Sequence, residues 1–126
     1  MRRPASLAEV AEWTRDRQTF HLNVSDFVDE FRRSPVGLRL AEEPRRSAGV
    51  YDDGDVADAY LAAVALSLAR EIREPPPAWA WTEDRKLRRP WFAWPGPALR
   101  ATLLAESPAL FRERNLFVSA NVLSRA

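Results

Sequence analysis

Residues 56–73 read VADAYLAAVALSLAREIR, and this stretch decides the fold. Its middle, from Ala59 to Ala69, is apolar almost all round a helix and is bounded by Asp58 and Arg70. A helix without a polar face is normally surrounded by other helices, and this 11-residue run is too short to cross a membrane. We therefore predict that residues 56–73 form the central helix of an all-α domain.

Both ends of this stretch carry helix boundary signals. We expect Asp53 or Asp55 to cap the start, because a carboxylate is favoured at the N-terminus of a helix. The three prolines at 75–77 end the helix, since proline cannot continue it. The carboxylates at 52–58 lack the alternating ligands and the terminal Glu of an EF-hand loop, so capping explains them better than calcium binding.

Two amphipathic helices are predicted before the central one. The first covers about residues 7–17 and starts with a capping box formed by Ser6 and Glu9. The second covers about residues 25–33, and its apolar side chains recur at helical spacing: Val24, Phe27, Val28 and Phe31. Each helix therefore has one face that can pack against the central helix. The loop between them holds His21, which we interpret as a surface or packing residue.

Residues 36–51 and 75–97 are predicted to be irregular. The second of these segments holds six of the ten prolines and four of the five tryptophans. After it, Gly96 and Pro97 open a helix with an apolar face of leucines, and Ser107-Pro108 opens a shorter one that ends near Asn115. No strand pair stands out. The fold class is therefore all-α: a single domain, residues 1–126, with five to six helices around the central helix and a Pro/Trp-rich loop.

The composition excludes several kinds of site. The 126 residues include no cysteine and one histidine, which rules out thiolate chemistry and multi-histidine metal sites. The 19 basic and 18 acidic residues give a net charge of +1, which argues against a dedicated nucleic-acid binder. We expect no cofactor. A start without a signal-peptide pattern and the lack of cysteine favour a cytoplasmic location.

The Pro/Trp-rich segment is the candidate site. Arginine supplies 18 of the 19 basic residues, and several arginines alternate with tryptophans in this segment. Three interpretations stay open: the rings pack over the central helix, they bind another protein, or they stack on single-stranded nucleic acid. We predict that the partner-binding residues are Trp79, Trp81, Arg85, Arg88, Arg89, Trp91, Phe92 and Trp94.

A metal-dependent enzyme is the alternative. The pairs Glu9-x-x-Glu12 and Asp26-x-x-Asp29 each place two carboxylates on one helix face, where they could converge on Mg²⁺. This arrangement is similar to that of the all-α nucleoside triphosphate pyrophosphohydrolases. The second pair departs from the family by its shorter side chains, and no Lys or Asn set for the base or phosphate follows.

The C-terminal part of the chain also carries a family resemblance. The residues concerned lie within about 55–126 and include DAYL at 58–61, RPWF at 89–92, PALR at 97–100, ESPA at 106–109 and FRERN at 111–115. They resemble a family of small proteins of GC-rich bacteria, chiefly actinobacteria. The resemblance implies an antitoxin-like partner of a neighbouring, nucleotidyltransferase-like toxin, and it implies no catalytic residue.

The function we expect is therefore a non-catalytic protein-interaction domain that neutralises a toxin by steric occlusion. The alternatives are a small metal-dependent nucleotide pyrophosphohydrolase and a nucleic-acid-binding regulator that uses Arg85–Arg89. The partner is expected to be a protein, with nucleic acid disfavoured and no membrane involved.

Overall fold

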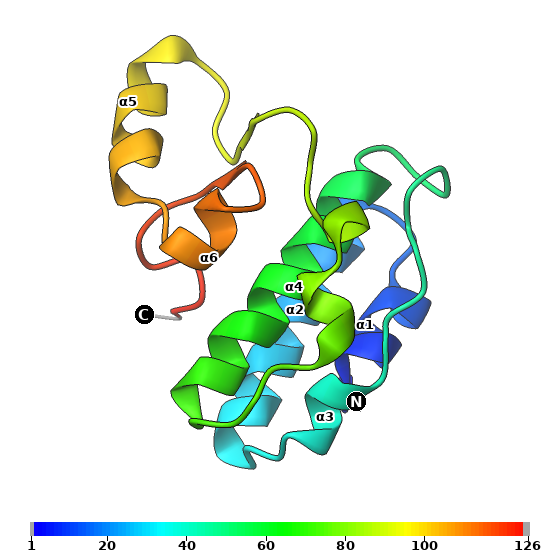
Figure 1. Cartoon of the computed structure of the whole chain (residues 1–126). Helices are drawn as coiled ribbons and strands as arrows, with labels where there is room; N and C mark the ends of the chain where they lie inside the picture. The colour runs from blue at the N-terminus through cyan, green and yellow to red at the C-terminus, as the bar shows by residue number, and fades with distance from the viewer. Residues whose placement is uncertain (1, 125–126) are drawn as a thin grey trace.

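The computed structural model describes residues 2–124, and Figure 1 shows its helices gathered around one long central helix. The described residues form six α-helices, two short 3₁₀ helices and one pair of two-residue strands. The fold is all-α, as predicted. The elements in chain order are α1 (Leu7–Trp13), α2 (Arg17–Arg33), α3 (Leu38–Ala41), α4 (Gly54–Glu71), η1 (Ala78–Trp81), η2 (Glu83–Arg85), β1 (Trp91–Phe92), α5 (Pro97–Glu106), α6 (Ala109–Arg112) and β2 (Leu116–Phe117).

The central helix α4 is buried on nearly all sides. Leu61, Val64 and Leu68 are fully enclosed, and the alanines between them let neighbouring elements approach closely. The 3₁₀ turns and α6 pack on it, and α2 lies along it, with Phe20 against Tyr60 and Arg32 paired with Glu71 (Figure 1). The prediction of a central apolar helix is therefore confirmed. In the described part of the chain, no helix is both long and apolar enough to cross a membrane.

Helix α1 starts as predicted and ends earlier than predicted. The Ser6 side chain accepts a hydrogen bond from the Glu9 amide at 3.1 Å, while the Glu9 carboxylate accepts one from the Ala5 amide at 2.8 Å. The helix stops at Trp13, because the next residue, Thr14, takes an extended backbone and turns its hydroxyl back to the Val10 carbonyl. The boundary predicted at Arg17 was wrong.

Helix α2 starts eight residues before the predicted boundary at residue 25. Asp16 and Thr19 form a capping box, in which the Asp16 carboxylate accepts the Thr19 amide at 2.8 Å. The Thr19 hydroxyl in turn accepts the Asp16 amide at 3.1 Å. His21 consequently lies on a helix and not in a loop. The predicted apolar stripe is confirmed, because Val24, Phe27, Val28 and Phe31 are all buried.

The connection between α2 and α4 is irregular apart from the single turn of α3. It passes so close to the start of α4 that a Cβ on Gly54 would lie 1.8 Å from the Ser47 carbonyl oxygen. Asp53 occupies the N-cap position of α4 with a left-handed backbone (φ 62°), but its side chain makes no capping hydrogen bond. Of the two residues expected to cap the helix, Asp53 or Asp55, Asp53 holds the cap position, but the expected side-chain capping bond is absent there; its carboxylate pairs with Arg17 at 2.8 Å.

A short parallel strand pair, not predicted from the sequence, holds the C-terminal part together. Trp91 is in register with Leu116, and Phe92 with Phe117. Helices α5 and α6 lie between the two strands in the sequence. Helix α5 projects away from the bundle, and α6 packs on α4 (Figure 1). Pro97 at the start of α5 and the left-handed Asn115 after α6 are as predicted.

Candidate interaction surface

The structure divides the eight predicted partner-binding residues into two groups. Trp79 is 7% exposed and Arg85 is fully buried, so neither is presented to a partner. Trp81 and Trp94 are 51% and 59% exposed. The remaining four are partly or fully exposed: Arg88, Arg89, Trp91 and Phe92.

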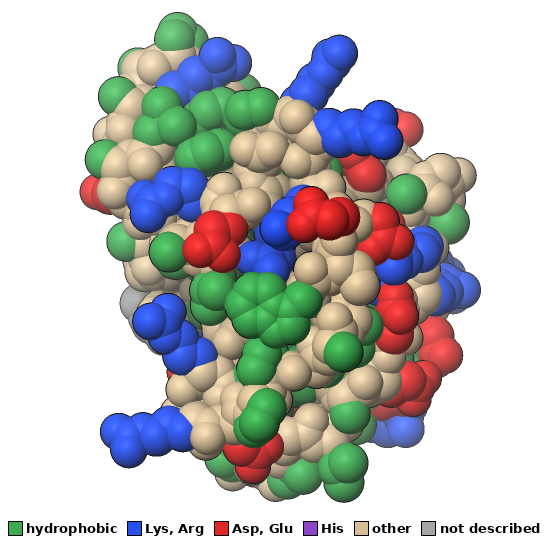
Figure 2. Space-filling model, in the orientation of Figure 1, with side chains coloured by type: hydrophobic (Ala, Val, Ile, Leu, Met, Phe, Trp, Pro, Cys, Tyr) green, Lys and Arg blue, Asp and Glu red, His purple; other side chains and the backbone are tan. Residues whose placement is uncertain are grey.

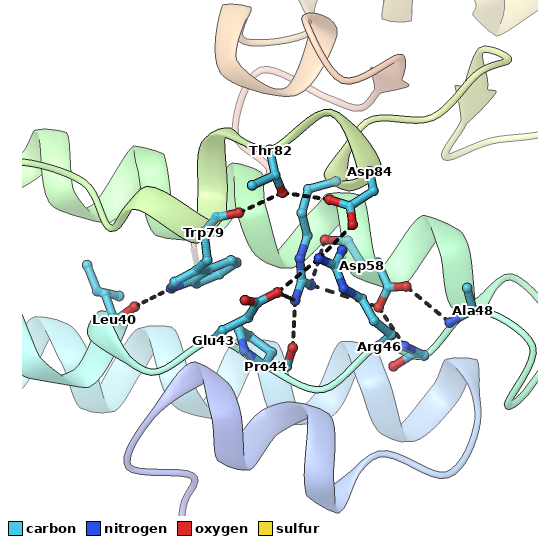
Figure 3. A network of polar contacts seen from close by, with 11 residues as sticks. Leu40, Glu43, Pro44, Arg46, Ala48, Asp58, Trp79, Thr82 and Asp84 are labelled. Atoms are coloured by element: carbon cyan, nitrogen blue, oxygen red, sulfur yellow. Dashed lines mark hydrogen bonds and ion pairs between the residues drawn. The ribbon is translucent and has the colours of Figure 1, made fainter.

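Trp79 and Arg85 form the centre of a buried polar network, drawn in Figure 3. The Trp79 indole nitrogen donates a hydrogen bond to the Leu40 carbonyl at 3.0 Å, and the Arg85 guanidinium lies 4.9 Å from the centre of the indole ring. Arg85 donates to the Pro44 carbonyl at 2.6 Å and to the Asp58 carbonyl at 3.3 Å. These contacts tie the turn at 79–85 to the α3–α4 connection.

Asp58 completes the network from α4 (Figure 3). Its carboxylate accepts hydrogen bonds from the backbone amides of Ser47 and Ala48 at 2.7 and 3.1 Å, and it lies 3.9 Å from an Arg85 nitrogen. Glu43 contributes a second carboxylate, 3.2 Å from Arg85. Burial lowers the pKa of the Arg85 guanidinium, and the hydrogen bond with Glu43 opposes that shift. Arg85 and Trp79 therefore hold three segments together and are structural residues.

Arg114 is a second buried arginine, and sequence reasoning missed it. Its guanidinium donates to the Leu110 and Ala80 carbonyls at 2.9 and 3.3 Å and lies 5.6 Å from the centre of the Trp81 ring. Burial lowers the pKa of this group too. The half-exposed Trp81 thus covers Arg114. The sequence places Arg114 beside Asn115 at the end of a predicted helix. That position alone does not distinguish a buried arginine from an exposed one.

Three large hydrophobic side chains are exposed on α5 and the segment before it: Trp94, Leu99 and Leu104. Five others among the described residues are exposed elsewhere: Leu22, Val36, Leu38, Val50 and Trp81. Hydrophobic side chains gather at the upper left of Figure 2, where Figure 1 places α5. Within α5, all of which the structure describes, only Leu103 is buried. Leu99 and Leu104 are about half exposed. We call residues 91–105 the α5 surface. Trp94 is its most exposed aromatic side chain among those described.

The α5 surface is attached to the body by a few defined contacts. The Phe92 and Phe117 rings stack with their centres 5.1 Å apart, and the Arg100 guanidinium lies 5.1 Å from the Phe92 ring. At the far end of α5, the Ser107 hydroxyl donates to the Leu116 carbonyl at 2.8 Å. The surface is therefore held in place at its base, while its outer side is open to solvent.

Arg88 and Arg89 line a different feature, a hollow of about 850 Å³ between the start of α4 and the 83–91 segment. The hollow is lined by carboxylates as well as cations: Asp53, Asp55, Asp58, Glu83 and Asp84 face the same space as Lys86, Arg88 and Arg89. A nucleic-acid backbone placed there would be repelled by the negative charge on the opposite wall. The mixed charge of this hollow therefore does not favour the nucleic-acid hypothesis.

Two of the four carboxylates of the metal-enzyme hypothesis, Glu9 and Asp29, lie beside arginines. The Glu9 carboxylate accepts from the Ala5 amide and pairs with Arg2 at 2.6 Å, and Asp29 lies 3.8 Å from Arg3. Over residues 2–124, no group of three or more acidic or histidine side chains is placed to hold a metal ion. Glu9, Glu12, Asp26 and Asp29 are therefore not assembled into such a site.

His21 packs among aromatic rings. Its ring meets Phe20 and Tyr60 edge-on, at centre distances of 5.5 and 6.0 Å. Burial and the positive charge of Arg17 lower the pKa of His21. His21 is exposed and contacts two rings, which agrees with the prediction of a surface or packing residue.

Comparison with protein-family models, with curated protein sequences and with solved structures gave no match. The proposal of an interaction domain therefore rests on the geometry of the α5 surface and on the chemistry of its residues, and the proposal of a toxin partner rests on the resemblance of residues 55–126.

Proposed function

We propose that this protein is a non-catalytic interaction domain that binds another protein through the α5 surface. One observation carries the proposal: α5 is a ten-residue helix that exposes nine of its ten residues. Helices shorter than about 12–15 residues are marginal on their own in water, and most gain their stability by packing an apolar face. A partner that covers α5 supplies that packing.

The residues on the surface are suited to a protein partner. Tryptophan and arginine are the residues that most often dominate binding energy at protein interfaces. Trp94 precedes α5 and Arg100 lies within it, and both are exposed. Arg100 and Glu106 are the only charged residues in the sequence of the helix. We therefore expect α5 to enter an apolar groove on its partner, in the manner of other helix-in-groove complexes.

We propose further that the partner is a toxin and that binding neutralises it in the cytoplasm by covering its active site. The support is the resemblance of residues 55–126 to an antitoxin family, together with the exposed surface of α5. The mechanism is steric. It needs no cofactor and no chemistry from this chain.

Co-expression with the protein encoded beside its gene tests the proposal. We expect that protein alone to arrest growth, and we expect co-expression to restore growth and give a complex that co-purifies. A harmless neighbour that forms no complex would overturn the toxin assignment.

A pair of leucine variants tests the surface itself. Leu104 on α5 and Leu22 on α2 are 48% and 58% exposed, so Leu104→Glu and Leu22→Glu make the same chemical change at two similarly exposed sites. We expect Leu104→Glu to weaken the complex by about tenfold or more, because it puts a charge into an apolar contact, and Leu22→Glu to leave affinity unchanged. Equal effects of the two variants would show that α5 is not the interface.

A further inference from the structure

A second hollow, of about 380 Å³, is lined by residues of the N-terminal segment, of the end of α2 and of α3. Figure 1 shows these segments at the end of the molecule away from α5. It is separate from the α5 surface, so an inference about it does not rest on the proposed function. Four arginines line it together with one alanine and one glutamate: Arg2, Arg3, Arg33, Arg39, Ala5 and Glu30.

The lining holds four arginines and one carboxylate, and two further carboxylates, Glu9 and Asp29, lie beside two of these arginines. Arg2 is engaged by Glu9 at 2.6 Å. Arg3 lies 3.8 Å from Asp29, and Arg33 lies 3.9 Å from Glu30, both longer than a hydrogen bond. Several guanidinium groups around one space repel each other, and an anion bound between them relieves that repulsion.

Arg39 gives the second, independent observation. Its Nη1 is buried, and it has no hydrogen-bond partner among the described residues. A buried donor without an acceptor is unfavourable, and it is more so when the group is charged. An oxyanion held in the hollow offers Arg39 acceptor atoms that the chain itself does not provide.

We propose that this hollow is a binding site for a diphosphate group. The planar fork of arginine matches phosphate oxygens with paired hydrogen bonds, and such charge-assisted bonds are the strongest that side chains make. A diphosphate suits a lining of four arginines better than a single phosphate, because it offers more acceptor oxygens and can meet several guanidinium groups at once. None of the described residues lining the hollow is aromatic. We therefore expect the site to bind the phosphate groups of a ligand and not to stack on a base.

Isothermal titration of the full chain with inorganic pyrophosphate at low salt tests the site. We expect a Kd below about 1 mM, and a weakening of about tenfold or more in Arg39→Gln, which loses charge-assisted hydrogen bonds. Arg33→Gln changes an exposed rim residue, so it reports on the site even if Arg39→Gln fails to fold. Arg112→Gln on α6 is the control with the same change of charge, and we expect it to bind within about twofold of the unaltered protein.

ADP and a single-stranded oligonucleotide distinguish the possible sources of the phosphates. Binding of both ADP and pyrophosphate supports a diphosphate carried by a nucleotide, and binding of pyrophosphate alone supports the free ion. The proposal is overturned if pyrophosphate does not bind at about 10 mM. It is also overturned if Arg33→Gln and Arg112→Gln weaken binding equally, or if only the oligonucleotide binds.

Discussion

Replacing Arg85 with alanine removes the cation at the centre of the buried network and distinguishes a structural from a partner-binding role. The substitution takes the donor away from the Pro44 carbonyl and takes the positive charge away from the Asp58 carboxylate, whose side chain is 4% exposed. It also leaves a space over the face of Trp79. Loss of folding stability is the expected result, and no partner is needed to observe it.

The size of the loss follows from these contacts. Removing one member of a buried ion pair costs about 3–5 kcal/mol. Asp58 keeps its two backbone donors, Ser47 and Ala48, so we expect the lower end, about 3 kcal/mol. With an unfolding entropy of about 2.1 cal/mol/K per residue over 126 residues, the melting temperature falls by about 10 °C.

Thermal and urea unfolding followed by circular dichroism measure this effect. Arg88→Ala is the matched control, because Arg88 lies in the same segment and is exposed; its cost should stay within about 0.5 kcal/mol. A double-mutant cycle with Asp58→Asn should give a coupling energy of at least about 1 kcal/mol. The structural interpretation of Arg85 is refuted if the two variants have the same free energy of unfolding and only Arg85→Ala fails to bind the partner protein.

Two further predictions concern α4. Gly54→Ala should lower the free energy of unfolding by about 2 kcal/mol, because the new Cβ would lie 1.8 Å from the Ser47 carbonyl oxygen and the α3–α4 connection must move. An unchanged midpoint in urea would contradict this close approach. Burial raises the pKa of Tyr60 to about 12. Between pH 10 and 12 the folded chain therefore holds a proton that the unfolded chain has lost. The free energy of unfolding should fall with rising pH by up to about 3 kcal/mol. Tyr60→Phe should remove the part of this slope that Tyr60 contributes; a smaller slope remains because burial also raises the pKa of Tyr51. Titration of both tyrosines of the folded protein at ordinary pKa values, followed by absorbance, would contradict the prediction.

The sequence predicts the helices whose apolar pattern is long and regular. The enclosed position of α4 follows from residues 59–69, because no polar face remains to meet water. The stripe of α2 likewise follows from its spacing. The start of α2 was missed because its capping box uses Asp16 and Thr19, which differs from the commoner pattern of Ser or Thr followed by Glu or Gln.

The two buried arginines show where sequence reasoning stops. Arg85 lies in a charged run beside Glu83 and Asp84, a pattern typical of a solvated surface. It is buried because Asp58, Glu43 and the Pro44 carbonyl converge on it from distant parts of the chain. Long-range convergence of this kind leaves no periodic signal. The α5 surface is easier to anticipate, since its aromatic and leucine residues are close in sequence, but their exposure depends on where the strand pair directs the helix.

The parallel strand pair has a consequence for how this protein can change. Ala93 donates to the Phe117 carbonyl at 3.0 Å, and Ser107 bonds to the Leu116 carbonyl and to the Val118 amide. Residues 94–106 therefore leave the body and rejoin it at adjacent points on one short segment. We expect that such a loop can be replaced as a unit. Its length and its side chains can change while the residues on both sides keep their contacts with the body. Recognition can thus diversify between related chains without a new core, and a transplanted 94–106 segment should carry its binding preference with it.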